Sequence, residues 1–222
     1  MVFDFEAGEV ILIDKPLEWT SFDVVKKIRN AIRLKKIGHA GTLDPLATGL
    51  LILCTGKKTK SIESYQAQEK EYTGTFVIGA TTPSFDLETE VVITGDWTSV
   101  SEAAIYAAAI AMTGKQEQIP PMYSAVRVDG VRLYKLARKG EEIEIKPRPI
   151  EIVEFEITQI NLPTIEFRIK CSKGTYIRSI ARDFGEALNV GAYLSSLRRT
   201  KIGDFDVKDA YAVNDFIDLV KK

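Results

Sequence analysis

A loop rich in glycine and proline places the strongest constraint on how this chain can fold. Residues 38–49, GHAGTLDPLATG, contain three glycines, Pro45 and the only histidine of the protein, so they are not expected to continue a helix. Glycine lets the backbone come close to a ligand, and a proline biases the residue before it toward an extended conformation. The side chain of Asp44 is therefore expected to be presented from a loop.

The charge pattern around Asp44 is unusual. Asp44 is the only acidic residue between Val24 and Lys60, and the same stretch carries nine basic residues: Lys26, Lys27, Arg29, Arg33, Lys35, Lys36, Lys57, Lys58 and Lys60. Such a carboxylate is either a structural counter-ion or a reactive group that acts as a nucleophile or general base. The simpler alternatives are an aspartate that hydrogen-bonds its own turn, or a partner for a nearby lysine.

The overall charge of the chain argues against a uniformly basic nucleic-acid-binding protein, but its distribution does not. The net charge is −1 and the pI is about 6.0. Residues 168–201 nevertheless carry eight basic residues against two acidic ones, whereas acidic residues gather in residues 71–102 and 141–156. This separation is compatible with a polyanionic partner that binds one face of the protein.

The order of apolar segments predicts one α/β domain with a mixed sheet and helices on its faces. A chain of 222 residues with 45% hydrophobic residues suits one elaborated domain of this kind. Strands are predicted at residues 9–13, 50–55, 71–78, 144–160, 165–171 and 194–201. Helices are predicted at residues 22–33, 57–66, 103–112, 131–138 and 175–188, with a last one from Asn214. Extended chain is predicted at residues 122–128, and a turn at Asp129-Gly130.

Several classes of protein are disfavoured by what the sequence contains. The acidic N-terminus does not resemble a signal peptide, and the longest apolar run, residues 50–54, is too short to cross a bilayer, so a cytoplasmic protein without membrane contact is expected. Cys54 and Cys171 are each flanked by apolar or β-branched residues and are predicted to be small core residues. One histidine without paired cysteines makes a zinc site, including that of a zinc deaminase, improbable; no metal is expected.

Other catalytic motifs fail on spacing. The Gly56-Lys57-Lys58 segment lacks the earlier glycine that a phosphate-binding loop needs, since Leu51 occupies that position. A catalytic triad with His39 as base would need a serine in a nucleophile elbow, and the sequence has no such pattern.

Six separated segments resemble motifs of the TruB family, the tRNA pseudouridine-55 synthases. The segment HAGTLDPLATGLL, residues 39–51, is similar to the catalytic motif of that family. The others are similar to further family motifs and occur in the family's order: residues 14–16, 70–72, 120–125, 171–178 and 197–199. Together they run from Val10 to Arg199, so nearly the whole chain takes part in the resemblance.

The resemblance implies both a fold and a reaction. It implies a single pseudouridine-synthase catalytic domain over residues 1–222, with a central, mixed, mostly antiparallel sheet flanked by helices. It also implies isomerisation of one uridine in the T arm of tRNA without a cofactor, in which the base is detached and rejoined through carbon. The target base must leave its stack to be reached. A monomer with tRNA as its partner is expected.

The resemblance assigns roles to individual residues. Asp44 matches the nucleophile, which attacks either the sugar or the base ring, and Arg178 matches the arginine that pairs with it. Tyr72 matches the tyrosine that stacks on the flipped base, with a core aromatic residue as the alternative. His39 matches the residue linked to base extrusion, with a loop histidine satisfied by backbone as the alternative.

Further residues are expected to bind the RNA. Lys15, Lys35 and Lys36 suit phosphate contacts, with solvated lysines as the alternative. Leu197 is expected to line the pocket unless it is a core residue, and Tyr176 is expected to contact the substrate.

The chain also departs from the family pattern. Bacterial relatives often carry a C-terminal PUA domain, and residues 202–222 are too few for it. The segment around Asp86 differs from the usual pattern, so a substrate contact by Asp86 is not carried over. Two other functions stay open: an RNA-binding module without turnover, and the same chemistry inside a guide-RNA complex, which the short chain disfavours.

Overall fold

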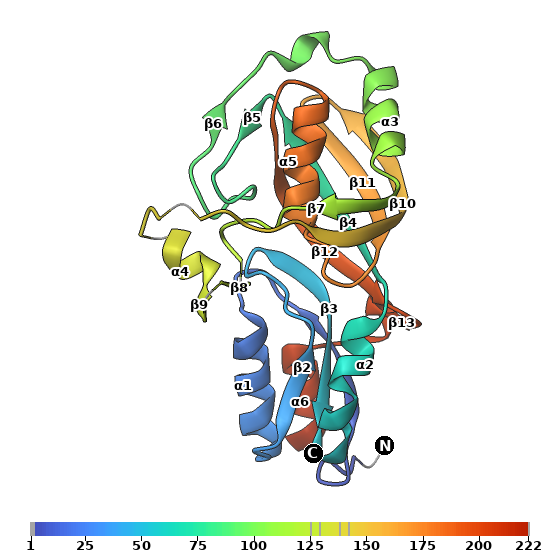
Figure 1. Cartoon of the computed structure of the whole chain (residues 1–222). Helices are drawn as coiled ribbons and strands as arrows, with labels where there is room; N and C mark the ends of the chain where they lie inside the picture. The colour runs from blue at the N-terminus through green and yellow to red at the C-terminus, as the bar shows by residue number, and fades with distance from the viewer. Residues whose placement is uncertain (1–2, 125, 129, 138, 142, 222) are drawn as a thin grey trace. The chain divides into compact units, whose positions relative to one another are not determined.

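The computed structural model describes residues 3–124, 126–128, 130–137, 139–141 and 143–221 (Figure 1). The chain forms two compact units. The first consists of Met1–Thr73 and Leu197–Lys222, and the second of Gly74–Ser196. Strands β4 (Lys70–Ile78) and β12 (Ala192–Ile202) each belong partly to both.

The first unit is built around β3, which has a strand partner on each side. In the sheet order β14-β1-β3-β12, β3 pairs antiparallel with β1 and parallel with β12, and β2 also pairs antiparallel with β3. The remaining strands are β1 (Val10–Lys15), β2 (Ile37–Ala40), β3 (Ala47–Thr55), β13 (Phe205–Asp206) and β14 (Tyr211–Ala212). The helices are α1 (Ser21–Ile32), α2 (Ile62–Ala67) and α6 (Val213–Lys221), with 3-10 turns η1 (Gly56–Ser61) and η3 (Val207–Asp209).

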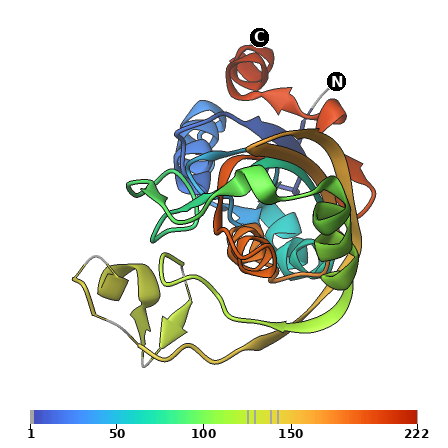
Figure 2. The same cartoon turned by 90° about the horizontal axis from the view of Figure 1, so that it is seen from above.

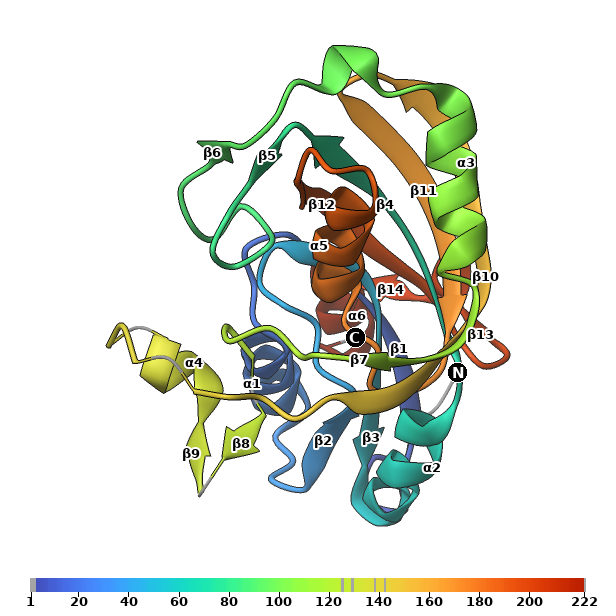
Figure 3. The same cartoon turned by 45° about the horizontal axis from the view of Figure 1, so that its top comes forward.

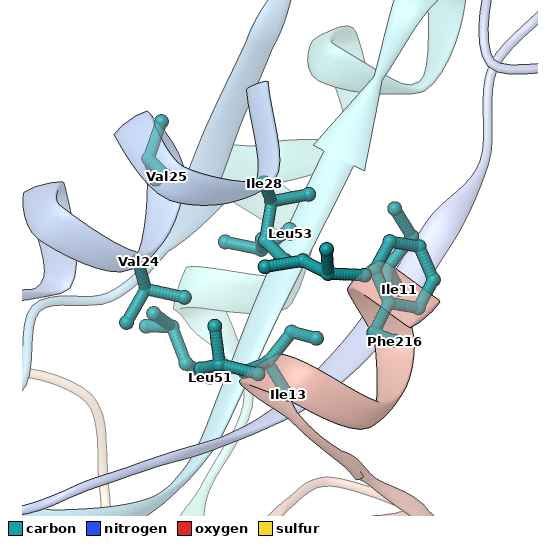
Figure 4. Packing of buried hydrophobic residues seen from close by; sticks show 10 residues of the cluster. Ile11, Ile13, Val24, Val25, Ile28, Leu51, Leu53 and Phe216 are labelled. Carbon is teal, nitrogen blue, oxygen red and sulfur yellow. The ribbon is translucent and has the colours of Figure 1, made fainter. Parts of the chain in front are cut away.

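Helix α1 starts at a capping box and buries one face. The hydroxyl of Thr20 accepts a hydrogen bond from the amide of Asp23, and the Asp23 carboxylate accepts one from the amide of Thr20. The apolar face of α1 packs with α6 against β1 and β3 (Figure 4). Its members include Val24, Ile28 and Phe216. This packing places the first turn of α1 beside the loop that follows β2.

The second unit combines a curved sheet with helices and a small separate lobe. Its sheet order is β4-β11-β10-β7, and α3 lies along β10 (Figure 3). Figure 2 shows β8, β9 and α4 set apart from this sheet. The elements are β5 (Ala80–Thr81), β6 (Val92–Ile93), η2 (Trp97–Ser99), α3 (Glu102–Ala111), β7 (Gly114–Gln118), β8 (Arg127–Val128), β9 (Val131–Arg132), α4 (Leu133–Ala137), β10 (Arg148–Asn161), β11 (Thr164–Cys171) and α5 (Ile177–Ala187).

Aromatic packing forms part of the core of the second unit. The rings of Phe76 and Phe167 stack with their centroids 4.1 Å apart, and Phe184 of α5 lies 5.4 Å from Phe76. Phe155 contacts the same group from β10. Offset and tilted aromatic contacts of this kind stabilise a core beyond the area they bury. Helix α5 is therefore anchored to the sheet through Phe184.

The predicted fold class is confirmed, with local differences. His39 lies in strand β2 and not in a loop, because β2 pairs with β3. The polar strand β7 was not predicted, and β10 begins at Arg148, four residues later than expected. Ala125, Asp129 and Arg138, which belong to predicted segments, lie outside the described residues. Cys54 and Cys171 occupy buried strand positions, as predicted.

No helix among the described residues is long and apolar enough to cross a membrane.

The docking of α6 predicts a large difference between two apolar positions on one helix. Phe216 is fully buried, whereas Leu219 is 39% exposed. Phe216→Ala should lower the free energy of unfolding by about 3 to 5 kcal/mol, because it leaves a cavity against α1 and β1. Chemical denaturation measures this change. The matched control, Leu219→Ala, should cost less than about 1 kcal/mol; equal losses would contradict the packing described here.

Candidate active site

Asp44 opens a tight turn in the loop between β2 and β3. Its carbonyl accepts a hydrogen bond from the amide of Ala47, 3.1 Å away, which closes a four-residue turn with Pro45 at the second position. Aspartate first and proline second are the preferred residues of such a turn. The Asp44 side chain is half-buried. Asp44 therefore lies in a non-helical loop, as predicted.

The first turn of α1 holds the backbone next to Asp44. The Ser21 hydroxyl accepts a hydrogen bond from the amide of Leu43 at 2.9 Å and donates one to the Leu43 carbonyl at 3.2 Å. The Leu43 side chain is buried beneath the loop. On the other side of Asp44, the amide of Glu18 donates to the carbonyl of Pro45 at 2.9 Å. Both peptide neighbours of Asp44 are thus bonded to the segment that begins α1.

Lys15 is buried below the same loop. Its side-chain amine donates to three backbone carbonyls: Trp19 at 2.6 Å, Pro16 at 2.9 Å and Pro45 at 3.3 Å. Burial lowers the pKa of Lys15 from 10.5 to about 8, and the negative charge of Asp44 partly opposes that shift. Because this amine is fully buried and hydrogen-bonded to backbone carbonyls, it supports the loop and is not accessible to a phosphate group.

Arg199 holds the start of the loop from the opposite strand. It is 1% exposed, and its guanidinium donates to the carbonyls of Leu50 at 2.8 Å, Gly41 at 3.2 Å and Thr42 at 3.4 Å. The backbone of Arg199 pairs with Gly49, where an added Cβ would lie 2.3 Å from the Arg199 carbonyl oxygen and φ is +104°. Only glycine allows β12 to approach β3 this closely.

An ion pair joins β12 to β1 beside these residues. Arg198 Nη1 and Nη2 lie 3.0 and 2.6 Å from the two carboxylate oxygens of Asp14, and Nη1 also lies 3.4 Å from the Thr48 hydroxyl. The two paired side chains are about one-third exposed. A two-point pair between planar groups fixes geometry as well as charge. This ion pair therefore joins two motifs that are far apart in sequence, residues 14–16 and 197–199.

His39 and Leu197 lie near the two ends of the loop. His39 is half-buried, and desolvation lowers its pKa below 6.5, so the ring is neutral near pH 7. Its Nδ1 atom has no hydrogen-bond partner among the residues that the structure describes. Leu197 is half-buried and pairs in parallel register with Ala47, the first residue of β3. Both side chains therefore come from strands that flank the loop.

The other predicted residues of the first unit differ in exposure. Tyr72 lies on β4 and is only 9% exposed, so both a core role and a role in the site suit its position. Lys35 and Lys36 are exposed between α1 and β2, where the amide of Gly56 donates to the Lys36 carbonyl. Their exposure agrees with phosphate contacts and also with solvated lysines.

Arg178 has a carboxylate partner inside the second unit. It lies in the first turn of α5 and is 3% exposed; its Nε atom lies 3.5 Å from Asp86 Oδ2, and its Nη1 donates to the Ser84 carbonyl. Asp86 is also buried, and its Oδ1 accepts a hydrogen bond from the amide of Glu88. The sequence assigned no role to Asp86, and the structure shows it as the buried carboxylate beside Arg178. Pairing of Arg178 with Asp44 stays a prediction.

The backbone before α5 is held by a glutamine side chain. Gln118 of β7 accepts a hydrogen bond from the amide of Tyr176 at 2.8 Å and donates one to its carbonyl at 3.1 Å. The Tyr176 ring packs against a cluster that includes Leu133 and Leu136 of α4. Tyr176 therefore links α5 to the small lobe, a contact that the sequence did not reveal.

Comparison with known families agrees with the motif pattern. Residues 29–177 match the TruB family pseudouridylate synthase (N terminal domain), and residues 178–222 match the tRNA pseudouridylate synthase B C-terminal domain. The tRNA pseudouridine synthase B of Flavobacterium johnsoniae is 56% identical over 220 residues, which cover 96% of each chain. The tRNA pseudouridine synthase B of Phocaeicola vulgatus is 52% identical, and the alignment covers 93% of its length.

Solved structures share the fold. A chain of a Cbf5-Nop10-Gar1 complex superposes with a TM-score of 0.76 at 30% identity, and a chain of an H/ACA RNP bound to a substrate RNA containing 2'-deoxyuridine with 0.72 at 28%. Each alignment covers 96% of the present chain. It covers only 54% and 53% of those chains, so the present chain spans about half their length.

The burial of Lys15 predicts a pH-dependent stability. Because its pKa is about 8 in the folded protein and near 10.5 in the unfolded chain, the unfolded state binds more protons between these values. The free energy of unfolding of the wild type should therefore rise with pH across this window, relative to Lys15→Met, by an amount on the order of 3 kcal/mol. Chemical denaturation of both proteins from pH 7 to 10.5 measures it. Parallel pH profiles would contradict a desolvated amine.

Proposed function

The chain belongs to the TruB family of pseudouridylate synthases and forms pseudouridine in tRNA, and we propose that its target is the uridine at position 55 in the T arm. We further propose that Asp44 is the nucleophile and that residues 1–222 act as one catalytic domain. The observation that carries the proposal is the loop around Asp44. Its backbone is held from three directions, by Lys15, Ser21 and Arg199, while Asp44 itself is half-buried.

The proposed reaction is an isomerisation that balances without a cofactor. The Asp44 carboxylate adds either to C1′ of the ribose or to C6 of the uracil ring, and the N1–C1′ bond breaks. The base turns, a C5–C1′ bond forms, and the carboxylate is released. The proton on C5 is lost and N1 gains one, so substrate and product have the same composition. A carboxylate held in a fixed geometry suits this role, because positioning supplies a large part of the rate enhancement.

Base flipping gives the carboxylate access to the target. A base in a folded RNA arm is stacked, and extruding it costs about a few kcal/mol. We propose that the neutral ring of His39 contacts the RNA during extrusion, which agrees with its lowered pKa and its unpartnered Nδ1 atom among the described residues. Leu197 is proposed to form part of the pocket wall beside the loop.

Arg178 and Tyr72 complete the proposed catalytic set. We propose that the guanidinium of Arg178 stabilises the ionised Asp44 during the reaction, as the motif resemblance implies, and that Asp86 orients Arg178 before substrate binds. Tyr72 is proposed to stack on the flipped base. Tyr176 is proposed to support the substrate-facing start of α5 through its contacts with Gln118 and α4.

The proposed role of Lys15 changes in view of its burial. Its amine is bonded to three carbonyls below the loop, which favours positioning of the Asp44 backbone over a phosphate contact. Lys35 and Lys36 are exposed and remain proposed phosphate contacts.

Replacement of Asp44 gives the direct test of the nucleophile. Asp44→Asn and Asp44→Ala should each lower pseudouridine formation on a T-arm stem-loop by at least about 10⁴-fold, because the amide and the methyl group cannot form the covalent intermediate. The control is Asp204→Asn, which removes an exposed carboxylate of the β12–β13 turn and should retain activity. Retained turnover by Asp44→Asn would exclude Asp44 as the nucleophile.

The same assay separates the alternative functions. Wild-type protein that binds the stem-loop with a steep salt dependence but forms no pseudouridine would be an RNA-binding module. Activity that appears only with a guide RNA and accessory proteins would place the chemistry in a guided complex. Activity of the purified chain on full tRNA, lost when the uridine at position 55 is replaced by cytidine, is the expected result.

A compensated pair of substitutions separates the catalytic role of Arg178 from its structural role. Arg178→Met leaves Asp86 buried without its cation and should cost about 3 to 5 kcal/mol of stability. Arg178→Met combined with Asp86→Asn removes that charge and keeps an acceptor for the Glu88 amide. The double variant should regain most of the stability, measured by denaturation, but remain about 10²-fold or more reduced in kcat. Recovery of activity together with stability would make Arg178 purely structural.

A further inference from the structure

The start of α1 and the segment before it expose two apolar side chains. Among the described residues of the first unit, only three large apolar side chains are substantially exposed: Phe22 at 60%, Leu17 at 53% and Leu219 at 39%. Phe22 follows Ser21, whose hydroxyl holds Leu43, and Leu17 precedes Glu18, whose amide holds Pro45. The two most exposed of the three therefore lie on the segments that are bonded to the loop.

The other end of α1 forms a basic cavity. A concavity of about 370 Å³ is lined by Arg29, Asn30, Arg33, Leu34 and Lys35. It contains three cationic side chains and no carboxylate, and none of the ion pairs found among the described residues neutralises these cations. A site of this kind suits a phosphate group, and Arg and Lys are the usual phosphate ligands in RNA complexes.

The helix separates these two features by a defined distance. Phe22 precedes Arg29, the first residue that lines the cavity, by seven residues, and an α-helix rises 1.5 Å per residue, so about 10 Å of helix separates the two. The capping box fixes its first turn, and Val24, Val25 and Ile28 bury its inner face. A helix that starts beside the backbone of the Asp44 loop with an exposed apolar side chain, and ends in a cluster of cations, can hold one RNA at two points.

We propose that α1 positions the tRNA through both ends: an unpaired base next to the target uridine stacks on Phe22, and a backbone phosphate occupies the basic cavity. This inference rests on the proposed function, since it takes Asp44 as the point where the target is held. Exposed aromatic rings are the usual stacking platforms for unpaired bases. The cavity adds Arg29 and Arg33 to the phosphate contacts, and neither was assigned from the sequence.

The two contacts differ in their response to salt, which makes them separable. Stacking releases no counterions, whereas each phosphate contact that is lost reduces the slope of log Kd against log salt by about one. Binding of unmodified tRNA is measured from 50 to 300 mM KCl in the Asp44→Asn background, so that no turnover occurs. The assay measures tRNA binding and not isomerisation. A result showing that Asp44 is not the nucleophile would therefore leave the test of this proposal unaffected.

The stacking contact is tested with variants that change the ring but keep apolar surface. Phe22→Leu should raise Kd about tenfold at every salt concentration with an unchanged slope, whereas Phe22→Trp should bind at least as tightly as the parent protein. The control, Leu219→Ala, should leave Kd unchanged. Equal affinity of Phe22→Leu and the parent protein would overturn the stacking contact.

The phosphate contact is tested at Arg33, which needs a substitution that respects its backbone. Its φ is +52°, a left-handed conformation that asparagine tolerates better than most residues. Arg33→Asn should raise Kd about tenfold at low salt and reduce the slope by about one, and Arg33→Lys should restore most of both. Lys208→Gln, at a lysine already paired with Asp206, is the matched control and should change neither. An unchanged slope for Arg33→Asn would overturn the phosphate contact.

Discussion

Two buried cations hold the backbone on either side of Asp44. Lys15 donates to the carbonyl of Pro45, and Arg199 donates to the carbonyls of Gly41 and Thr42. A buried charge without compensating hydrogen bonds is strongly destabilising. The loop carbonyls therefore stabilise the two buried cations, and the cations in turn fix the loop backbone. The hydrogen-bond acceptors of both cations are backbone carbonyls, and the negative charge of Asp44 adds a favourable electrostatic interaction with Lys15.

This arrangement bears on whether Asp44 is a counter-ion or a reactive group. Positive charge from Lys15 attracts the Asp44 carboxylate, but the hydrogen bonds of the Lys15 amine go to backbone oxygens. The carboxylate is thus presented from a rigid turn that is supported from below. A rigid support is what positional catalysis requires, since a small displacement of the reacting group has a large effect on rate.

The second unit uses a different means to fix its functional arginine. Arg178 is buried in the first turn of α5 beside Asp86, while Phe184 anchors the same helix to the sheet and Gln118 holds the backbone that precedes it. A buried ion pair contributes little net stability but fixes orientation, because losing either partner leaves an uncompensated charge. Both units therefore place a predicted functional residue on a segment that tertiary contacts hold, through hydrogen bonds around Asp44 and through Gln118 and Phe184 around Arg178.

Local patterns in the sequence determined α1, β3 and the turn at Asp44, because periodicity, a capping box and an Asp-Pro pair act over a few residues. The separated motifs also identified the family. The sequence did not reveal β7, a polar segment that becomes a strand by pairing with β10, or the strand around His39. The burial of Lys15 and Arg199 was decided only by the tertiary structure. Arg199 and Leu50 are far apart in the chain, and a charged side chain can be buried only where folding brings such distant carbonyls to it.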